Sequence, residues 1–263
     1  MPSKLLVDRP ADGVARLLIN RPDKRNAIDH DVRQLMIEAL HQVLADGQTR
    51  ALLLGGVGGH LSAGGDIPSM VGLSEAQARE RMQHIASLCR LVDGAGIPVV
   101  TAMEGVSAGA CVGLALLGDR IIVGQGTRIL FPFLKLGLAP DWGSLLTLPQ
   151  RVGSAVALQI ACSGEPILGE EAHRLGLADE LVDDSEVMAT AVARAAMLAR
   201  LPLEAFARMK RRLKAPSTSL DEELRREEDD QAVLLRGVDF QEGYDAFVNK
   251  RSANFTRARE AQS

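Results

Sequence analysis

The sequence predicts an α/β fold in which helices cover both faces of a mostly parallel sheet. Two observations lead to this prediction. Short apolar runs with strand character alternate with longer amphipathic segments, and some of the short runs are apolar enough for strands buried on both faces. The length of 263 residues allows one large domain, or one domain with an appendage.

The first half of the chain is predicted to contain strands over 14–20, 51–56, 97–104 and 120–124, and helices over 29–47, 74–93 and 105–119. The first strand, VARLLIN, is apolar and β-branched, and a Pro-led turn follows it. Asp29 and Ser74 stand where the N-caps of the next two helices are expected. The second strand, ALLLGG, leads into a Gly-rich loop, and the helix over 105–119 is rich in small residues.

After residue 150 the pattern becomes mainly helical. Short helices are predicted in SAVALQIACSG and GEEAHRLGL, a short strand in ELVDD, and a long helical stretch over 186–214. From residue 217 the charge density rises, as in a solvated helical tail. Several apolar side chains in this tail need a cover, and a partner subunit is a natural one. These residues are Leu224, Val233, Leu234, Leu235, Phe240, Tyr244 and Phe247.

Composition excludes several classes of protein. A net charge of −4, with one Trp and one Tyr, gives no reason to expect a nucleic-acid partner. Three cysteines, Cys89, Cys111 and Cys162, are widely spaced in apolar surroundings, which favours reduced thiols over disulfides or a metal site. The N-terminal MPSKLLVDRPADG has no apolar signal core, and no apolar run reaches membrane-spanning length. We therefore expect a cytoplasmic protein with no membrane partner.

One motif suggests a serine hydrolase. Residues 105–109, GVSAG, match G-x-S-x-G between a strand and a helix, and Ser107, Asp141 and His173 follow in the order of a triad. His173 is the sole histidine after Ser107, and it lies in a charged helical turn where a solvent-facing role is expected rather than that of a buried, oriented base. The same segment has a second use, because a Gly/Ala-rich helix start leaves backbone N–H groups unpaired.

A second strand-to-helix junction, HLSAGGDI at 60–67, has the same character. Its small residues allow the main chain to approach a ligand, and Asp66 can cap the next turn. Two such junctions on neighbouring strands, each presenting one free N–H, would form an oxyanion hole with two donors.

Five segments in order resemble the enoyl-CoA hydratase/isomerase (crotonase) superfamily over essentially the whole chain. They are NRPDKRNAI (20–28), LSAGGDI (61–67), EGVSAGACVGLAL (104–116), FLKLGLAPDWGS (133–144) and FVNKRSANF (247–255). The resemblance implies a crotonase-like spiral of ββα units over 1–195, which binds acyl-CoA, and a helical C-terminal trimerisation region over 196–263. It also implies an acyl-CoA thioester held by the amides of Gly65 and Ala110, with coenzyme A as part of the substrate and no separate cofactor or metal.

The chain departs from the hydratase pattern at two positions. Where that pattern has two glutamates that orient water and deliver a proton, this sequence has Gly113 and Phe133. The resemblance therefore speaks against ordinary hydration here.

Asp141 is the remaining acid of this region. Its position resembles that of a catalytic aspartate in dienoyl-CoA isomerases and in an aromatic-acyl-CoA dehalogenase. The run KLGLxPDxG, together with Ala110, is most similar to the ring-epoxide isomerase branch of phenylacetyl-CoA catabolism. That branch also isomerises Δ3 to Δ2 enoyl-CoA. From its sequence position alone, the favoured role of Asp141 is an N-cap for WGSLLTLP, and the resemblance shifts the preference to catalysis. As a base it would need a raised pKa, and nearby apolar residues could dehydrate it. These are Phe133, Leu134, Leu138 and Trp142.

The resemblance also suggests where coenzyme A binds. The positions matched to the nucleotide and pantetheine are Lys24, Arg25, Ala27, Ala63, Asp66 and Ile67, with Phe247 and Lys250 supplied by a neighbouring subunit of a trimer or a dimer of trimers. Met70 and the VGLSEAQAR segment are expected to line the acyl pocket. An isomerase with Asp141 as its single base is the favoured function. A hydratase, hydrolysis or dehalogenation through Asp141, and an acyl-CoA binder without turnover remain as alternatives.

Overall fold

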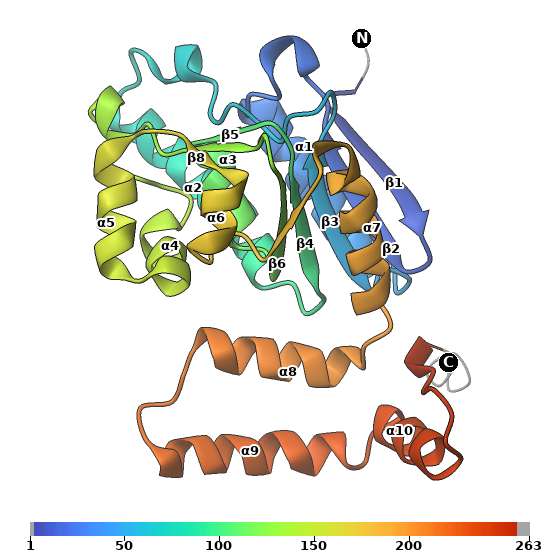
Figure 1. The fold of residues 1–263 in the computed structure, drawn as a ribbon. Helices are drawn as coiled ribbons and strands as arrows, with labels where there is room; N and C mark the ends of the chain where they lie inside the picture. The colour runs from blue at the N-terminus through green and yellow to red at the C-terminus, as the bar shows by residue number, and fades with distance from the viewer. Residues whose placement is uncertain (1–2, 257–263) are drawn as a thin grey trace.

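The computed structural model describes residues 3–256 and contains a six-stranded sheet with helices on both faces (Figure 1). The strand order is β1-β2-β3-β4-β6-β9, formed by β1 (Leu5–Ala11), β2 (Val14–Ile19), β3 (Ala51–Gly56), β4 (Val99–Met103), β6 (Arg120–Gly124) and β9 (Glu180–Val182). Within this sheet β1 is antiparallel to β2, and the strands β2, β3, β4, β6 and β9 run parallel to one another. The predicted α/β class is confirmed.

The two faces of the sheet contribute to separate cores. Along β3, Leu52 and Leu54 belong to the larger core with α1 (His30–Ala45) and α2 (Glu75–Asp93). The alternate residues Ala51 and Leu53 pack in a second core with α7 (Val187–Leu198). A strand buried on both faces has no polar positions, which explains the continuous run ALLLGG.

The predicted caps of the first two helices are confirmed. The Asp29 carboxylate accepts a hydrogen bond from the Val32 amide, and Ser74 forms a capping box with Gln77. The predicted helix over 105–119 is wrong in its first part. Residues Val106–Ala108 form a strand, β5, which pairs with β7 (Arg128–Leu130), and the helix α3 is confined to Ala110–Leu116. The strand β8 (Ile167–Leu168) completes this second, three-stranded sheet.

Three helices lie between residues 144 and 174: α4 (Ser144–Val152) and α5 (Ser154–Ser163) precede β8, and α6 (Gly169–Arg174) follows it. Short 3-10 turns occur at η1 (Pro22–Lys24), η2 (Ile67–Met70), η3 (Leu134–Leu136) and η4 (Asp184–Glu186). None of the helices within residues 3–256 has both the length and the apolar character of a membrane span.

The long helical stretch predicted over 186–214 is divided into α7 and α8 (Leu203–Lys214), because Pro202 cannot continue a helix. The predicted boundary at residue 196 lies within α7, and residues 257–263 of the predicted C-terminal region lie outside the described part. Helices α8, α9 (Leu220–Leu234) and α10 (Val238–Val248) form a layer at one end of the molecule (Figure 1). A groove of about 590 Å³ between α8 and α9, lined by Phe206, Met209 and Leu234 among others, belongs to this layer.

Candidate active site

The segments that were matched to a thioester site follow the carboxyl ends of β2, β3 and β4. Because these strands are parallel, their carboxyl ends meet at one edge of the sheet. Asn26 joins two of the segments: its amide nitrogen donates to the carbonyls of Val57 (2.9 Å) and His60 (2.8 Å), and its Oδ1 accepts from the Arg21 amide (2.8 Å). This fully buried side chain fixes the turn after β2 against the loop after β3.

The main chain leaves the Gly65 amide available as a donor. Gly65 forms an isolated parallel bridge with Ile28, in which the Ile28 amide donates to the Gly64 carbonyl (2.7 Å) and the Asp66 amide donates to the Ile28 carbonyl (3.1 Å). In a parallel bridge of this kind the N–H of the central residue points away from the partner strand. Within the described residues, no acceptor is assigned to the Gly65 amide.

The second predicted donor, Ala110, is the first residue of α3, so no turn of the helix precedes its amide. The loop containing Gly64 packs tightly here: a Cβ on Gly64 would lie 2.5 Å from the Ala108 carbonyl oxygen and 3.6 Å from the Ala110 nitrogen. Gly64 also has a φ of +97°, so this position requires glycine for both reasons. The structure therefore brings the Gly65 and Ala110 segments together.

Asp141 does not cap a helix. Helix α4 begins at Ser144, and its N-cap is Gly143 without a side-chain hydrogen bond. Instead the Asp141 carbonyl accepts from the Ser144 amide (3.0 Å) and hydroxyl (2.5 Å), which fixes the backbone of the turn. The carboxylate oxygen Oδ1 is buried, and no hydrogen-bond donor reaches it within residues 3–256.

Burial raises the pKa of the Asp141 carboxyl to about 6, while the charge of Arg81 acts in the opposite direction. Trp142, the next residue in the chain, is buried, and so is Phe133, as expected of residues that exclude water. Leu134 and Leu138 expose about half of their surface, at 51% and 47%, and their contribution to the dehydration of Asp141 stays a prediction. A carboxyl group with a pKa near 6 can both accept and return a proton near neutral pH.

The two positions that depart from the hydratase pattern contribute to packing. A Cβ on Gly113 would lie 2.5 Å from the Trp142 Cβ and 2.8 Å from the Ser144 hydroxyl, so no larger side chain fits there without rearrangement. This contact also packs the Asp141 turn against α3, one helical turn after Ala110. Phe133 is buried, and its ring approaches Gly109. Neither position offers a second acid.

The arrangement required of a serine hydrolase is absent from the described structure. Ser107 lies in the middle of β5 with no exposed surface, and its neighbours 106 and 108 hydrogen-bond to Ser62 through a second isolated bridge. His173 is exposed on α6, and its Nδ1 lies 3.4 Å from the Ala178 carbonyl oxygen. Ser107 is therefore part of the scaffold that joins the two donor loops.

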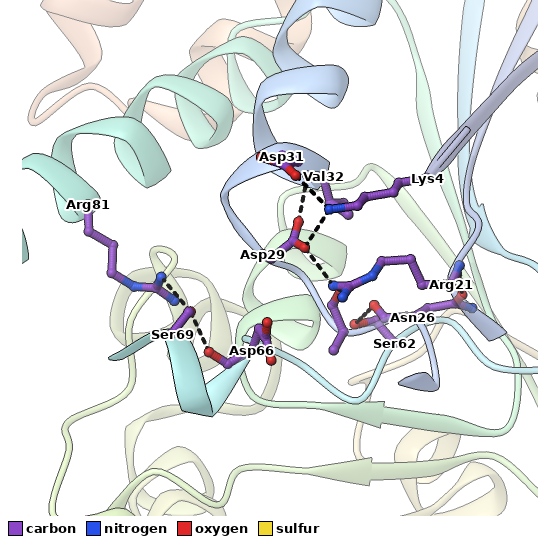
Figure 2. Close-up of polar contacts among 11 residues, drawn as sticks. Lys4, Arg21, Asn26, Asp29, Asp31, Val32, Ser62, Asp66, Ser69 and Arg81 are labelled. Carbon is purple, nitrogen blue, oxygen red and sulfur yellow. Dashed lines mark hydrogen bonds and ion pairs between the residues drawn. The ribbon is translucent and has the colours of Figure 1, made fainter. Parts of the chain in front are cut away.

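The residues matched to coenzyme A fall into two groups. The turn containing Lys24, Arg25 and Ala27 lies against the loop of Ala63, Asp66 and Ile67, and the Ala63 amide donates to the Arg25 carbonyl (2.8 Å). Figure 2 shows the polar contacts that surround this junction. Phe247, 83% exposed, and Lys250 belong instead to the α10 region at the opposite end of the molecule (Figure 1).

Sequence analysis missed two residues of α2 that lie near Asp141. Arg81 contributes the charge that lowers the Asp141 pKa, and the Asp141 charge in turn helps burial to raise the pKa of Cys89 to about 12. Helical spacing could have found Arg81, because the positions 81, 85, 88 and 92 form one stripe whose other members, Ile85, Leu88 and Val92, are buried. A charged residue in such a stripe is unusual.

Comparison with known proteins identifies the family of the chain. Residues 9–258 match the family model described as enoyl-CoA hydratase/isomerase. The chain is 35% identical over 251 residues to the 1,2-epoxyphenylacetyl-CoA isomerase of Escherichia coli K12, covering 93% of this chain and 95% of the relative. It is 36% identical over 249 residues to a probable enoyl-CoA hydratase of Rhodobacter capsulatus, covering 94% and 95%.

A solved structure gives the same result for the fold. The crystal structure of an enoyl-CoA hydratase from Polaromonas sp. JS666 superposes with a TM-score of 0.89 at 25% identity, and covers 95% of this chain and 98% of that one. The names of these relatives differ in the reaction, whereas the family model extends over nearly the whole chain. The protein belongs to the enoyl-CoA hydratase/isomerase family.

Proposed function

We propose that the protein is an enoyl-CoA isomerase that uses Asp141 as its single acid–base group. The observation that supports this most directly is the Asp141 carboxylate itself: its Oδ1 is buried and accepts no hydrogen bond in the described structure, and burial raises the pKa of the group to about 6. A carboxyl group whose ionisation is disfavoured by burial, and which has a buried oxygen left unpaired, is typical of a functional group.

The reaction needs one base. Moving a double bond from the β,γ to the α,β position removes a proton from C2 of the acyl group and returns a proton to C4, without adding water. Asp141 takes the first proton, becomes neutral, and delivers it to C4. The glutamates required for hydration are replaced by Gly113 and Phe133, which supports isomerisation over hydration.

The costly step is formation of the dienolate, whose charge develops on the thioester oxygen. The amides of Gly65 and Ala110 would hold that oxygen, and such donors act without reorganisation because the main chain is already fixed. Removal of one donor from a site of this kind typically costs about 10²- to 10³-fold in rate. The name of the Escherichia coli relative, an isomerase, supports the same choice.

We further propose a homo-oligomer, a trimer or a dimer of trimers, in which Phe247 and Lys250 of one subunit close over the coenzyme A of another. Exposed apolar side chains of α9 and α10 support this assembly, among them Leu224, Phe240 and Tyr244. Lys24, Arg25 and Ala27 would face the nucleotide and pantetheine together with Ala63, Asp66 and Ile67. A reducing, cytoplasmic location is supported by the free thiols of Cys89, Cys111 and Cys162.

The test is proton exchange on a 3-enoyl-CoA in D₂O, followed by NMR for the wild type and Asp141→Asn. We expect deuterium at C2 or C4 with bond migration in the wild type, and loss of both in the variant with binding of the ester retained. Asp12→Asn, an exposed aspartate in the turn between β1 and β2, is the matched control. A wild type that binds the ester without exchange or migration would contradict the isomerase and favour a binder or another reaction at Asp141.

A further inference from the structure

A short parallel ladder connects the two loops that carry the proposed oxyanion donors. The Ser62 amide donates to the Val106 carbonyl (3.3 Å), and the Ala108 amide donates to the Ser62 carbonyl (3.0 Å). Gly65 lies shortly after Ser62 in the chain, and Ala110 shortly after Ala108. A shift in this ladder would therefore move the two proposed donors relative to each other.

His60 extends the ladder with its side chain. In a regular parallel ladder, the next bond would run from the Val106 amide to the His60 carbonyl. That carbonyl instead accepts from Asn26 Nδ2 (2.8 Å), and the Val106 amide donates to the imidazole Nδ1 of His60 (3.1 Å). The ring nitrogen thus takes the place of a main-chain acceptor.

The direction of this bond determines the state of the imidazole. A main-chain N–H can only donate, so Nδ1 of His60 must be the accepting nitrogen, without a hydrogen. The ring is then neutral and carries its hydrogen on Nε2. Neither the other neutral tautomer nor the protonated ring can accept from the Val106 amide.

The main chain leaves room for this ring at Gly105. A Cβ on Gly105 would overlap His60 Nδ1 and the Gly59 carbonyl oxygen, and the φ of +48° also favours glycine. Gly105 is the first glycine of the GVSAG motif, in which the described structure shows no hydrolase arrangement. In this chain that glycine allows the ring of His60 to reach the Val106 amide.

We propose that His60 is a positioning residue, which holds the Gly65 loop against the Ala110 segment so that both amides reach one thioester oxygen. It acts through the main chain and does not contact the substrate. Without the Nδ1 acceptor the Val106 amide loses its partner, the start of the ladder separates, and one donor moves away from the oxygen. This inference rests on the proposed function, because the oxyanion hole is part of it.

Two variants separate the acceptor from the rest of the side chain. In His60→Asn, Oδ1 is bonded to Cγ, as Nδ1 is in histidine, so an acceptor stays at the same place. In His60→Gln the amide group is one bond farther from the main chain and corresponds to Nε2. His41→Gln, at an exposed histidine of α1, is the matched control.

The readout is the infrared carbonyl stretch of bound butanoyl-CoA that carries ¹³C at C1. Two donors polarise the carbonyl and lower this frequency, whether or not turnover occurs. We expect the same lowering in wild type, His60→Asn and His41→Gln, and loss of most of it in His60→Gln. The dissociation constant of the ester should change by less than about threefold, because the contacts with coenzyme A remain. With 3-enoyl-CoA, kcat/KM should fall about 10- to 100-fold in His60→Gln alone, since a small misplacement has this effect.

A long-range ¹H–¹⁵N spectrum of wild type tests the bond without a functional variant, with the His60 signals assigned by their absence in His60→Asn. Hydrogen on Nδ1 of His60 would overturn the proposal. An unlowered stretch in wild type would also do so, as would a lowering that His60→Gln retains or that both variants lose equally.

The outcomes for the two proposals are distinct. Butanoyl-CoA has no double bond to move, so its carbonyl stretch is independent of the isomerase test. The expected pattern of lowering without migration of the double bond in 3-enoyl-CoA would refute the proposed isomerase alone. Migration by wild type with a full lowering in His60→Gln would refute the role of His60 alone.

Discussion

At the scale of single residues, the proposed site depends on a carboxylate whose ionised form is disfavoured by burial. The sequence around Asp141 fits a helix cap as well as a base, and its resemblance to the family favours the base. The structure excludes the cap, because α4 begins three residues later at Ser144. Local pattern could not decide this, since whether a side chain has a partner depends on packing against α2 and α3.

The raised pKa of Asp141 predicts how activity and stability depend on pH. The base must be ionised, so kcat/KM should rise with pH up to about 6 and then level off. The free energy of unfolding changes in the opposite direction and falls as the pH rises. The pKa of Asp141 in the folded chain is above the unfolded value of 3.8, so ionisation favours the unfolded chain. The loss of stability develops between about pH 4 and 6 and is complete above that.

Asp141→Asn should therefore unfold at higher denaturant than wild type at pH 8, and at nearly the same denaturant at pH 4. After allowance for its partial exposure, the difference at pH 8 should be on the order of 1–2 kcal/mol. Urea unfolding at the two pH values measures this. A variant less stable than wild type at pH 8 would show that the carboxylate has a stabilising partner after all.

At the scale of elements, the sequence predicted correctly those strands and helix caps that depend on residues close together in the chain. The buried run at 51–56 and the caps Asp29 and Ser74 were correct, because a strand covered on both faces and a capped helix need no distant information. The strand Val106–Ala108 was missed, since three residues form a strand here through pairing with 128–130. The tight packing of Gly64 on the Ala108 carbonyl is non-local for the same reason.

A buried ion pair connects α8 to the sheet. Lys210 is buried, and its ammonium donates to Asp119 (2.7 Å) and to the Ile97 carbonyl (3.2 Å), while Asp119 also accepts from the Val99 amide (2.8 Å). Lys210→Met leaves Asp119 without its cation, and we expect a loss of about 3 kcal/mol in the free energy of unfolding.

The matched control for that variant is Lys214→Met, on the same helix. Lys214 pairs with Asp93 at the surface, with side chains 33% and 50% exposed, so its replacement should cost less than about 1 kcal/mol. Equal losses in the two variants, measured by chemical denaturation, would show that burial of the Lys210 pair contributes nothing.

At the scale of the whole molecule, the site and the C-terminal helices lie at opposite edges of the sheet (Figure 1). Asp119 and Val99, to which α8 is attached, stand at the amino ends of β6 and β4, whereas Gly65 and Ala110 follow the carboxyl ends of β3 and β4. Phe247 of α10 is thus remote from the site of its own chain. If it contacts coenzyme A, it does so in another subunit.

This arrangement predicts the mass of the protein in solution. We expect light scattering after size exclusion to give three or six times the 28.1 kDa of one chain. Arginine in place of both Phe240 and Tyr244, which lie one turn apart on α10 and are 48% and 55% exposed, should lower that mass. Wild type that remains at 28.1 kDa at micromolar concentration would contradict the assembly.

The two single-residue bridges at the site have a consequence for folding. Ile28 pairs with Gly65, and Ser62 pairs with Ser107, so the proposed oxyanion hole consists of three chain segments that are far apart in sequence and are joined by long-range contacts such as these. No segment can form half of the hole in advance, because each donor is oriented by a neighbour that is distant in sequence. During refolding, recovery of turnover should therefore lag behind recovery of helical circular dichroism. The rate at which activity returns then reports the rate at which the last long-range contacts form.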